Sequence, residues 1–248
     1  MIARRATHTR ILNRQARGRF VLLCDHASNY VPNELQNLGL SDSDLESHIA
    51  WDIGAAGITE ILSDLLRTPA VLCGVSRLVI DCNRQLSSPE LILASSHGIV
   101  VPGNVAIDPA SRETRITRWF YPYHEAVETL LRERIRQRSM PILIAIHSMT
   151  PVLDGKSRPW QIALSSGTDR RLSDQVLAAL RKPGDILVGD NVPYCVDPLV
   201  DCSIPLHALR RGLLNTQVEF RQDEIVTRAG QHGWATRLAR VLESIRFD

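Results

Sequence analysis

Four predicted strands of this sequence end in polar and titratable side chains. Asp25 and His26 follow FVLLC, and His147 follows ILIAI. The same pattern recurs after RLVI and within NTQVEFR, which add Asp81, Asn83, Arg84, Glu219 and Arg221. One such residue is more often a hydrogen-bonded polar group of the core than a catalytic one. Four such groups at one edge of a sheet indicate a functional site.

The residue types in this set suit metal-assisted hydrolysis. Two neutral imidazoles and one carboxylate are a common ligand set for catalytic zinc, and they leave one coordination position open. Zinc lowers the pKa of water to about 7 and polarises a carbonyl group. We predict His26 and His147 as the imidazole ligands and Glu219 as the general base. Arg84 is the predicted clamp for an anionic substrate.

The sequence does not settle which residue is the carboxylate ligand of this set. The spacing HxxE would place a glutamate three residues after His26, but Asn29 stands there. Asp52, at the head of a predicted helix, is the first candidate, and Asp25 is the alternative. His48 precedes Asp52 by four residues and would share its helix face. Such a pair is a ligand pair in some sites and at least as often an ordinary surface pair.

Other catalytic classes lack their sequence motifs. The chain contains no GxSxG elbow of a serine hydrolase, and neither the GxxxxGK nor the GxGxxG phosphate-binding pattern. Cys24 and Cys82 lie in or beside apolar segments, so we interpret them as buried thiols rather than nucleophiles. His124, in the aromatic run YPYHEAV, is interpreted as part of a packed or pocket-lining turn.

The composition is that of an ordinary globular protein. Of 248 residues, 44% are hydrophobic, and 29 basic residues face 27 acidic ones. This balance favours neither nucleic acid nor an anionic membrane as a partner. No apolar run approaches the roughly 18 residues of a membrane span, and the N-terminus lacks the apolar core of a secretory signal. Five cysteines without a CxxC pair indicate reduced thiols. We therefore expect a cytoplasmic protein, and the sequence carries no signal for an oligomeric state.

Short apolar runs alternate with amphipathic segments along the whole chain. Strands are predicted at 20–24, 69–74, 77–81, 141–148, 161–166, 185–190 and 213–220, and helices at 41–66, 112–138, 168–180 and 224–246. Pro122 is expected to kink the second helix or to start a new one. The loop 87–109 is long enough to be a lid or binding loop. The pattern predicts one α/β domain over 1–248, with a mixed, mostly parallel sheet flanked by helices on both faces.

Seven short motifs, in this order, resemble the N-formylglutamate amidohydrolase family. They are DHASNYVP (25–32), HIAWDIGA (48–55), VIDCNR (79–84), PYH (122–124), AIHSMTP (145–151), GDNVPY (189–194) and QVEFRQD (217–223). The resemblance extends from about residue 18 to the last predicted helix. It implies a fold similar to that of the zinc-dependent exopeptidases.

The resemblance also implies roles for individual residues. It places His26 and His147 as zinc ligands and Glu219 as the catalytic carboxylate, with Asn29 standing where these relatives have a glutamate ligand. Asn83 and Arg84 would hold the substrate α-carboxylate. The further predicted substrate-binding residues are Ser148, Asn191 and Tyr194, and Arg221 is a predicted aid to oxyanion stabilisation. Lys156, Arg158 and Arg210 are candidates for binding a side-chain carboxylate, although each is expected to be a surface charge.

The activity implied is zinc-dependent hydrolysis of a small N-acyl amino acid, with N-formyl-L-glutamate giving formate and glutamate. Two alternatives stay open. One is a zinc peptidase or deacylase for larger substrates, which an open loop at 87–109 would favour. The other is a catalytically silent binding protein of the same fold. A silent pocket has no physical need for Glu219, His147 and Arg84 together, which argues against that alternative.

Overall fold

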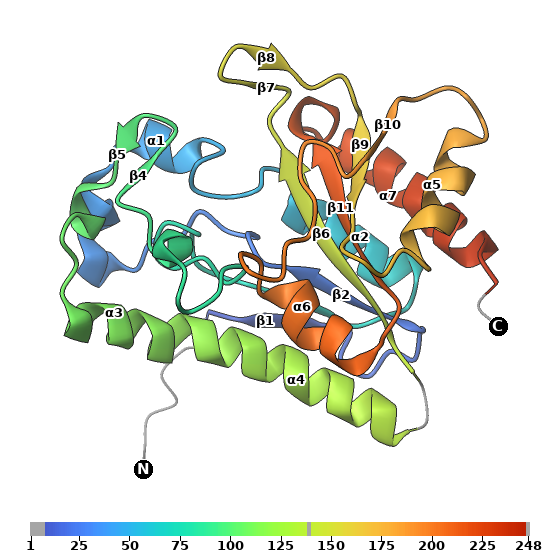
Figure 1. The fold of residues 1–248 in the computed structure, drawn as a ribbon, viewed down its shortest axis with the longest axis horizontal. Coiled ribbons are helices and arrows are strands. Elements are labelled where there is room, and N and C mark those ends of the chain that lie inside the picture. The colour runs from blue at the N-terminus through green and yellow to red at the C-terminus, as the bar shows by residue number, and fades with distance from the viewer. Residues whose placement is uncertain (1–7, 138–139, 247–248) are drawn as a thin grey trace.

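A seven-stranded sheet forms the centre of the computed structural model, which describes residues 8–137 and 140–246 (Figure 1). The strands in chain order are β1 (Arg10–Leu12), β2 (Phe20–Cys24), β3 (Ala70–Leu72), β6 (Ile142–Met149), β9 (Ile162–Ser165), β10 (Val188–Asp190) and β11 (Asn215–Arg221). Their spatial order is β1-β3-β2-β6-β11-β9-β10. Two small hairpins stand outside it, formed by β4 (Ser95–Ser96) with β5 (Ile99–Val100) and by β7 (Val152–Leu153) with β8 (Lys156–Ser157).

The sheet is mixed and mostly parallel, as the sequence predicts. The pairs β2–β3, β2–β6, β6–β11 and β9–β10 are parallel, and β1–β3 and β9–β11 are antiparallel. Because β2, β6 and β11 run in the same direction, their carboxyl ends lie at one edge of the sheet. This is the edge at which open α/β sheets bind their ligands.

Helices cover both faces of the sheet, again as predicted (Figure 1). They are α1 (Asp42–Glu46), α2 (Ala55–Leu65), α3 (Pro109–Arg115), α4 (Tyr121–Arg136), α5 (Ser173–Arg181), α6 (Ser203–His207) and α7 (Arg228–Ser244). Successive strand residues point to opposite faces. Thus Val21 and Leu23 of β2 join the apolar core under α4 and α6, and Leu22 and Cys24 join the core under α2, α5 and α7. That 1–248 is a single domain stays a prediction.

The helix predicted at 41–66 is wrong, because two helices form there instead. Ser41 caps α1, which ends after one turn, and α2 begins only after Gly54. Gly54 has φ 82°, a left-handed conformation that a helix interior does not allow. His48 and Asp52 therefore do not share a helix face. Instead they lie in the turn segment between α1 and α2, where the Asp52 N–H donates to the His26 carbonyl (3.0 Å).

The strand predicted at 77–81 is also wrong. Leu78, Val79 and Ile80 are fully buried, but residues 77–79 form a turn and Ile80 belongs to no strand. The Ser76 hydroxyl accepts a hydrogen bond from the Leu78 N–H, and the Ser76 carbonyl accepts one from the Val79 N–H. Because these local bonds satisfy the backbone, the segment is buried without a neighbouring strand. A short apolar run cannot distinguish such a turn from a strand.

Pro122 starts a new helix, as one of the two predicted alternatives states. The chain passes from α3 through one π-helical turn, Ile116–Phe120, into α4, which has Pro122 in its first turn. Proline has no N–H to donate to the preceding turn, so the hydrogen-bond ladder widens locally. Residue 138, the last of the predicted helix, lies outside the described residues. The strand predicted at 20–24 forms with these ends. The strands predicted at 69–74, 141–148, 161–166, 185–190 and 213–220 and the helices predicted at 168–180 and 224–246 form with shifted ends, whereas β1, α6 and both hairpins were not predicted.

All five cysteines are free thiols, and four of them are buried. None of the helices in the described part of the chain is long and apolar enough to cross a membrane. The first finding agrees with the interpretation of Cys24 and Cys82 as core residues.

A pair of buried histidines joins α4 to α6. His124 Nδ1 lies 2.9 Å from His207 Nε2, and His124 Nε2 lies 3.0 Å from the Cys82 carbonyl oxygen. Since a carbonyl only accepts, His124 must carry its proton on Nε2 and accept at Nδ1 from His207. His207 Nδ1 is then an unprotonated acceptor, buried without a hydrogen-bond partner. Burial lowers the pKa of both imidazoles, so both are neutral at pH 7, and His124 serves packing.

The substitution Gly54→Ala is expected to destabilise the fold more than Gly184→Ala. Both glycines have positive φ, 82° and 74°. An added Cβ at Gly54 would lie 2.6 Å from the Ile225 carbonyl oxygen, whereas nothing lies within 4 Å at Gly184. We expect the free energy of unfolding in urea to fall by about 1 kcal/mol for Gly184→Ala and about 2 to 4 kcal/mol for Gly54→Ala. Equal losses would show that the contact with Ile225 carries no energetic weight.

Acidification is expected to destabilise the protein through the histidine pair. Burial holds the pKa of His207 at about 3 and that of His124 at about 4. Unfolded imidazoles take up protons below about pH 6.5, while these two stay neutral. The free energy of unfolding therefore falls as the pH drops from about 6.5 towards these values, and by pH 5 His207 alone accounts for about 2 kcal/mol.

Removing the titrating group tests this account. His207→Gln should show about 2 kcal/mol less loss of unfolding free energy between pH 7 and pH 5 than the wild type. The matched control is His232→Gln, because His232 is exposed on α7. A pH dependence that is the same in His207→Gln as in the wild type would contradict the account.

Candidate active site

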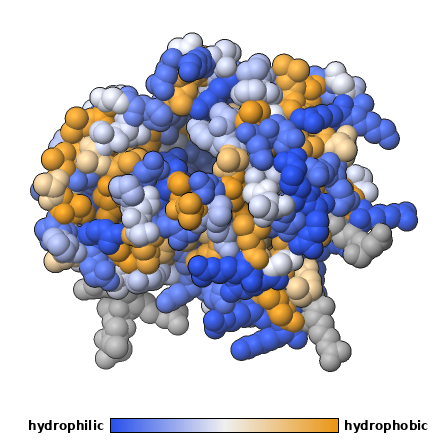
Figure 2. All heavy atoms as spheres, viewed as in Figure 1, coloured by the Kyte–Doolittle hydropathy of each residue, from blue (hydrophilic) through white to orange (hydrophobic). Residues whose placement is uncertain are grey.

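A cavity of about 590 Å³ opens at the carboxyl ends of β2, β6 and β11. On the face that Figure 2 shows, the surface is hollowed between the β4–β5 hairpin and the end of β6, with hydrophilic residues around the hollow. Part of the predicted loop 87–109 forms one wall, through Glu90, Leu93, Ser95, Ser96 and His97. The cavity therefore lies where the fold places a ligand site.

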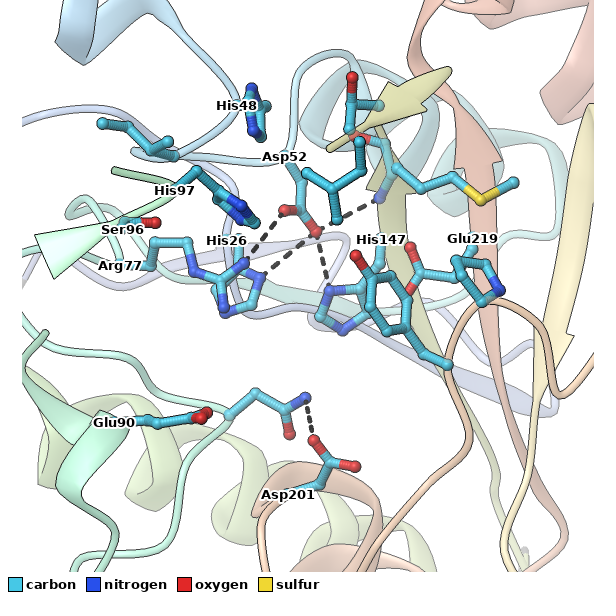
Figure 3. A pocket seen from close by; sticks show the side chains of 18 of the residues that line it. His26, His48, Asp52, Arg77, Glu90, Ser96, His97, His147, Asp201 and Glu219 are labelled. Carbon is cyan, nitrogen blue, oxygen red and sulfur yellow. Dashed lines mark hydrogen bonds and ion pairs between the residues drawn. The ribbon is translucent and has the colours of Figure 1, made fainter. Parts of the chain in front are cut away.

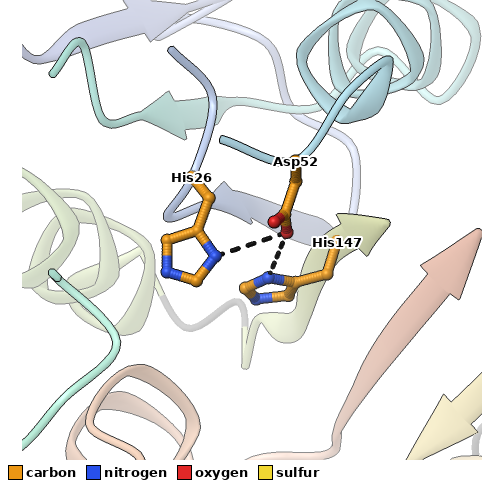
Figure 4. A group of neighbouring side chains, drawn as sticks. All are labelled: His26, Asp52 and His147. Carbon is orange, nitrogen blue, oxygen red and sulfur yellow. Dashed lines mark hydrogen bonds and ion pairs between the residues drawn. The ribbon is translucent and has the colours of Figure 1, made fainter. Parts of the chain in front are cut away.

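Three side chains from separate segments meet inside this cavity (Figure 4). His26 follows β2 by two residues, Asp52 lies in the turn before α2, and His147 is part of β6. Asp52 Oδ2 lies 3.3 Å from His26 Nδ1 and 2.8 Å from His147 Nδ1. One ligand atom from each residue lies within 4.8 Å of the others, and all three residues are buried. The structure thus brings together the three residues predicted as metal ligands.

Each imidazole has a second carboxylate behind it. His26 Nε2 lies 2.8 Å from Asp81 Oδ1, and His147 Nε2 lies 3.2 Å from Asp25 Oδ2. Metal-binding histidines commonly donate their other ring N–H to a carboxylate, which orients the ring and raises its basicity. The two Nδ1 atoms are therefore the ones directed at the shared centre beside Asp52. Asp25, the alternative ligand, occupies an outer position.

The outer carboxylates are themselves held by neighbours. Asp25 Oδ1 accepts hydrogen bonds from the Tyr123 and Ser203 hydroxyls, both at 2.6 Å. Asp81 Oδ2 accepts one from Arg77 Nη2 at 2.7 Å. Tyr123 belongs to α4 and Ser203 begins α6, so these two helices fix the orientation of the His147 imidazole through Asp25. Arg77, which lies in a turn, holds Asp81 and through it the His26 imidazole.

The electrostatics of the cluster favour positive charge. Burial would lower the pKa of His147, but hydrogen bonds to Asp25 and Asp52 outweigh burial and raise that pKa well above the usual range. Burial and Arg77 would lower the pKa of His26, yet Asp81 and Asp52 raise it. Three buried carboxylates thus surround two imidazoles. This donor set and this negative field fit a divalent cation, and zinc is the metal such ligands most often hold.

Asn29 does not take part in the cluster. Its side-chain nitrogen donates to the Leu45 carbonyl (3.1 Å), outside the cavity lining. Asp52 is close to both imidazoles because its own N–H bonds to the His26 carbonyl. The carboxylate that the HxxE spacing lacks is therefore supplied from the segment before α2.

Glu219 faces the cavity from β11, beside His147 in the register of the parallel strands β6 and β11 (Figure 3). It is 3% exposed, and its Oε1 accepts a hydrogen bond from Gln217 Nε2 (2.9 Å). Burial raises the pKa of Glu219, and Asp52 adds to this against the opposing effect of His147. A buried carboxylate whose pKa is raised suits a group that takes up and releases a proton.

Ser148 and Asn83 line the cavity, but much of their bonding capacity serves the protein. The Ser148 N–H donates to Asp52 Oδ2 (3.3 Å), and its hydroxyl donates to the Ile53 carbonyl (2.9 Å). Asn83 Oδ1 accepts from the backbone N–H groups of Cys202 and Ser203. Both residues hold the walls of the site in place. Their predicted contact with substrate stays a prediction.

The remaining predicted residues are divided between the cavity and its surroundings. Arg84 and Tyr194 line the cavity, whereas Asn191 and Arg221 do not. Asn191 Oδ1 accepts from the Ser166 N–H, and Arg221 bonds to Asp223, Glu224 and the carbonyls of Arg158 and Pro159. The guanidinium of Arg221 is thus held outside the cavity, which gives its predicted oxyanion role no geometric support.

Many of the cavity residues have no role assigned from the sequence, among them the polar residues Arg77, His97, Gln217 and Gln222. Arg77 begins the same RLVID segment that supplies Asp81, which was the available signal. Arg158, expected on the surface, is instead 7% exposed and lines the cavity, whereas Lys156 and Arg210 are exposed as expected. His48 also lines the cavity and stands beside His97, with ring centres 5.2 Å apart.

Comparisons with known proteins agree with this fold. A crystal structure of a gene product of Agrobacterium tumefaciens superposes with a TM-score of 0.91 at 34% sequence identity, covering 95% of each chain. The crystal structure of N-formylglutamate amidohydrolase from Ralstonia eutropha superposes with a TM-score of 0.67 at 16% identity, covering 94% of each chain, and so supports the fold alone. No curated protein matches this sequence.

The family assignment rests on a match over most of the sequence. Residues 18–226 match the description of the N-formylglutamate amidohydrolase family. This span includes all the predicted site residues and begins where the sequence resemblance begins. The resemblance is therefore confirmed, and the chain belongs to the N-formylglutamate amidohydrolase family.

Proposed function

We propose that this protein is a metal-dependent amidohydrolase that cleaves the N-acyl bond of a small N-acyl amino acid, with N-formyl-L-glutamate as the first candidate substrate. Family membership supports the reaction class. The observation that carries the proposal is the convergence of His26, Asp52 and His147 in one buried cluster, with Glu219 beside His147 in the same cavity.

His26, Asp52 and His147 would hold the metal, through Nδ1 of each imidazole and a carboxylate oxygen. A bound divalent ion would supply Lewis-acid chemistry, lowering the pKa of water and polarising the acyl carbonyl. The chain itself orients the two imidazoles through Asp25 and Asp81 and limits access of bulk water, since all five residues are at most 5% exposed.

Glu219 is the proposed general base and acid. Gln217 occupies Oε1, so Oε2 is the oxygen that would take the proton from the attacking water. The raised pKa of Glu219 lets the protonated carboxyl persist long enough to pass that proton to the leaving amine. One carboxylate can thus serve both halves of an amide hydrolysis.

The cavity suits a small substrate better than a peptide. Its volume of about 590 Å³ is within the range of small-molecule sites. The β4–β5 hairpin and the β7–β8 hairpin both contribute lining residues, so walls stand on more than one side of His26, Asp52 and His147. These walls favour an N-acyl amino acid over the larger substrates of a peptidase.

Metal removal is the direct test of the proposal. Protein treated with a chelator should release no formate from N-formyl-L-glutamate, and added zinc should restore the activity. Because two of the three ligands are imidazoles, His147→Ala should also lose the bound metal, about one ion per chain in the wild type. Metal content is measured by elemental analysis, with His232→Ala as the surface control. Full turnover by metal-free protein would rule out the metal-dependent mechanism.

The substitution Glu219→Gln should lower kcat by about a hundredfold or more, because it removes the group that carries the proton. Metal content and thermal stability should stay close to those of the wild type, since Glu219 is outside the proposed ligand set. Glu243→Gln, on the exposed side of α7, provides the matched control. Unchanged turnover in Glu219→Gln would remove this residue from the mechanism.

A further inference from the structure

Three arginines line the cavity, and they differ in how their charge is balanced. Arg77 donates to Asp81 Oδ2 at 2.7 Å and lies 3.8 Å from Asp52 Oδ1. Its guanidinium therefore belongs to the network of charged groups around His26, Asp52 and His147. The other two, Arg84 and Arg158, are the candidates for binding an anionic substrate.

Arg84 already has two carboxylate partners. Its Nε lies 2.9 Å from Glu90 Oε2, and its Nη1 lies 3.1 Å from Asp201 Oδ1. The backbones of Arg84 and Asp201 also form a β-bridge. A substrate carboxylate at the remaining N–H groups would meet the negative charges of both partners, which already balance the charge of the guanidinium. Arg84 is thus better suited to joining two walls of the cavity than to attracting an anion.

Arg158 has no such partner. Within residues 8–137 and 140–246, no carboxylate lies within 4.0 Å of its guanidinium. Its Nη2 donates to the Tyr194 hydroxyl oxygen at 2.9 Å, and its Cζ lies 5.1 Å from the centre of the Tyr194 ring. A guanidinium has five N–H donors and stays charged at all accessible pH values. A buried positive charge without a counter-ion is costly, so this position favours a bound anion.

The other charged residues of the cavity make an unpaired cation more important for binding an anion. Five cavity carboxylates, namely Asp52, Glu90, Asp197, Asp201 and Glu219, would repel an anionic substrate. Arg158 is the lining cation whose charge these residues do not neutralise by direct contact in the described part of the chain. Tyr194 adds a donor, because its oxygen accepts from Arg158 while its own O–H remains available to a second acceptor.

We propose that Arg158, supported by Tyr194, is the carboxylate-binding group of this cavity, in place of Arg84. The inference rests on the proposed function for the identity of the ligand, an N-acyl amino acid with at least one carboxylate. The guanidinium would donate two N–H groups to the carboxylate, and the Tyr194 hydroxyl would donate a third hydrogen bond. Arg84 would then be a wall residue held by Glu90 and Asp201.

Binding measurements separate this role from catalysis. The zinc-loaded Glu219→Gln protein serves as the background, because it should bind substrate without turning it over. Two ligands are titrated by calorimetry: N-formyl-L-glutamate and its uncharged diamide, in which both carboxylates are carboxamides. Adding Arg158→Gln should weaken binding of the dianion about tenfold to a hundredfold and change binding of the diamide less than about twofold.

Two further substitutions in the same background act as comparisons. Arg84→Gln should weaken the dianion less than Arg158→Gln does, because Arg84 is already neutralised. Lys156→Gln removes a positive charge from the neighbouring β8 strand, outside the cavity lining, and should leave both affinities unchanged. If Arg158→Gln does not fold, the variant Tyr194→Phe tests the proposal instead. It keeps the guanidinium and should weaken only the dianion, by about three- to tenfold.

The outcomes are distinguishable from those of the proposed function. Three results would each overturn the inference. Arg158→Gln could weaken the binding of both ligands equally, or Arg84→Gln could weaken binding of the dianion more than Arg158→Gln does. The Glu219→Gln protein without further substitution could also bind the diamide as tightly as the dianion. If the wild type releases no formate but shows Arg158-dependent binding of the dianion, the proposed reaction fails and the anion site stands. Titrating the two monoamides then shows which carboxylate Arg158 binds.

Discussion

The site depends on one buried carboxylate that two imidazoles share. Asp52 Oδ2 lies 3.3 Å from His26 Nδ1 and 2.8 Å from His147 Nδ1, and it also accepts the Ser148 N–H. The Asp52 side chain is only 7% exposed, and such a buried carboxylate is stable only if partners of this kind compensate for its lost hydration. The conformation of the segment before α2, including the positive φ of Gly54, therefore serves the site as well as the helix start.

The outer network ties this centre to the rest of the fold. Asp25 connects His147 to Tyr123 on α4 and Ser203 on α6, and Asp81 connects His26 to Arg77. The imidazoles are thus oriented by elements on the α4 side of the sheet, while Asp52 approaches from the chain that leads into α2 on the other side. Parallel strands with covered faces make this arrangement possible, because their carboxyl ends bring distant segments to one edge.

Much of the fold was predictable because its strands are buried on both faces. The runs FVLLC of β2 and ILIAI of β6 are continuous and apolar, so their positions and the residues after them could be identified. The residues of β11, NTQVEFR, are mostly polar, yet six of the seven are buried. The segments 41–66 and 77–81 were mispredicted for a common reason. Turns there are fixed by Gly54 and by hydrogen bonds of Ser76, and periodicity does not detect such local bonds.

The sequence by itself determined the chemistry available at the site: two strand-end histidines, a glutamate on the last strand and the family to which they belong. Only the tertiary structure decided which carboxylate completes the cluster, because Asp52 is 26 residues from His26 and 95 from His147 along the chain. The tertiary structure also decided which arginines are paired with carboxylates. Arg84 contacts Asp201, 117 residues away along the chain, while Arg158 contacts no carboxylate in the described chain. The physical reason is that the role of a charged side chain depends on the groups around it, and folding brings those groups together from distant parts of the sequence.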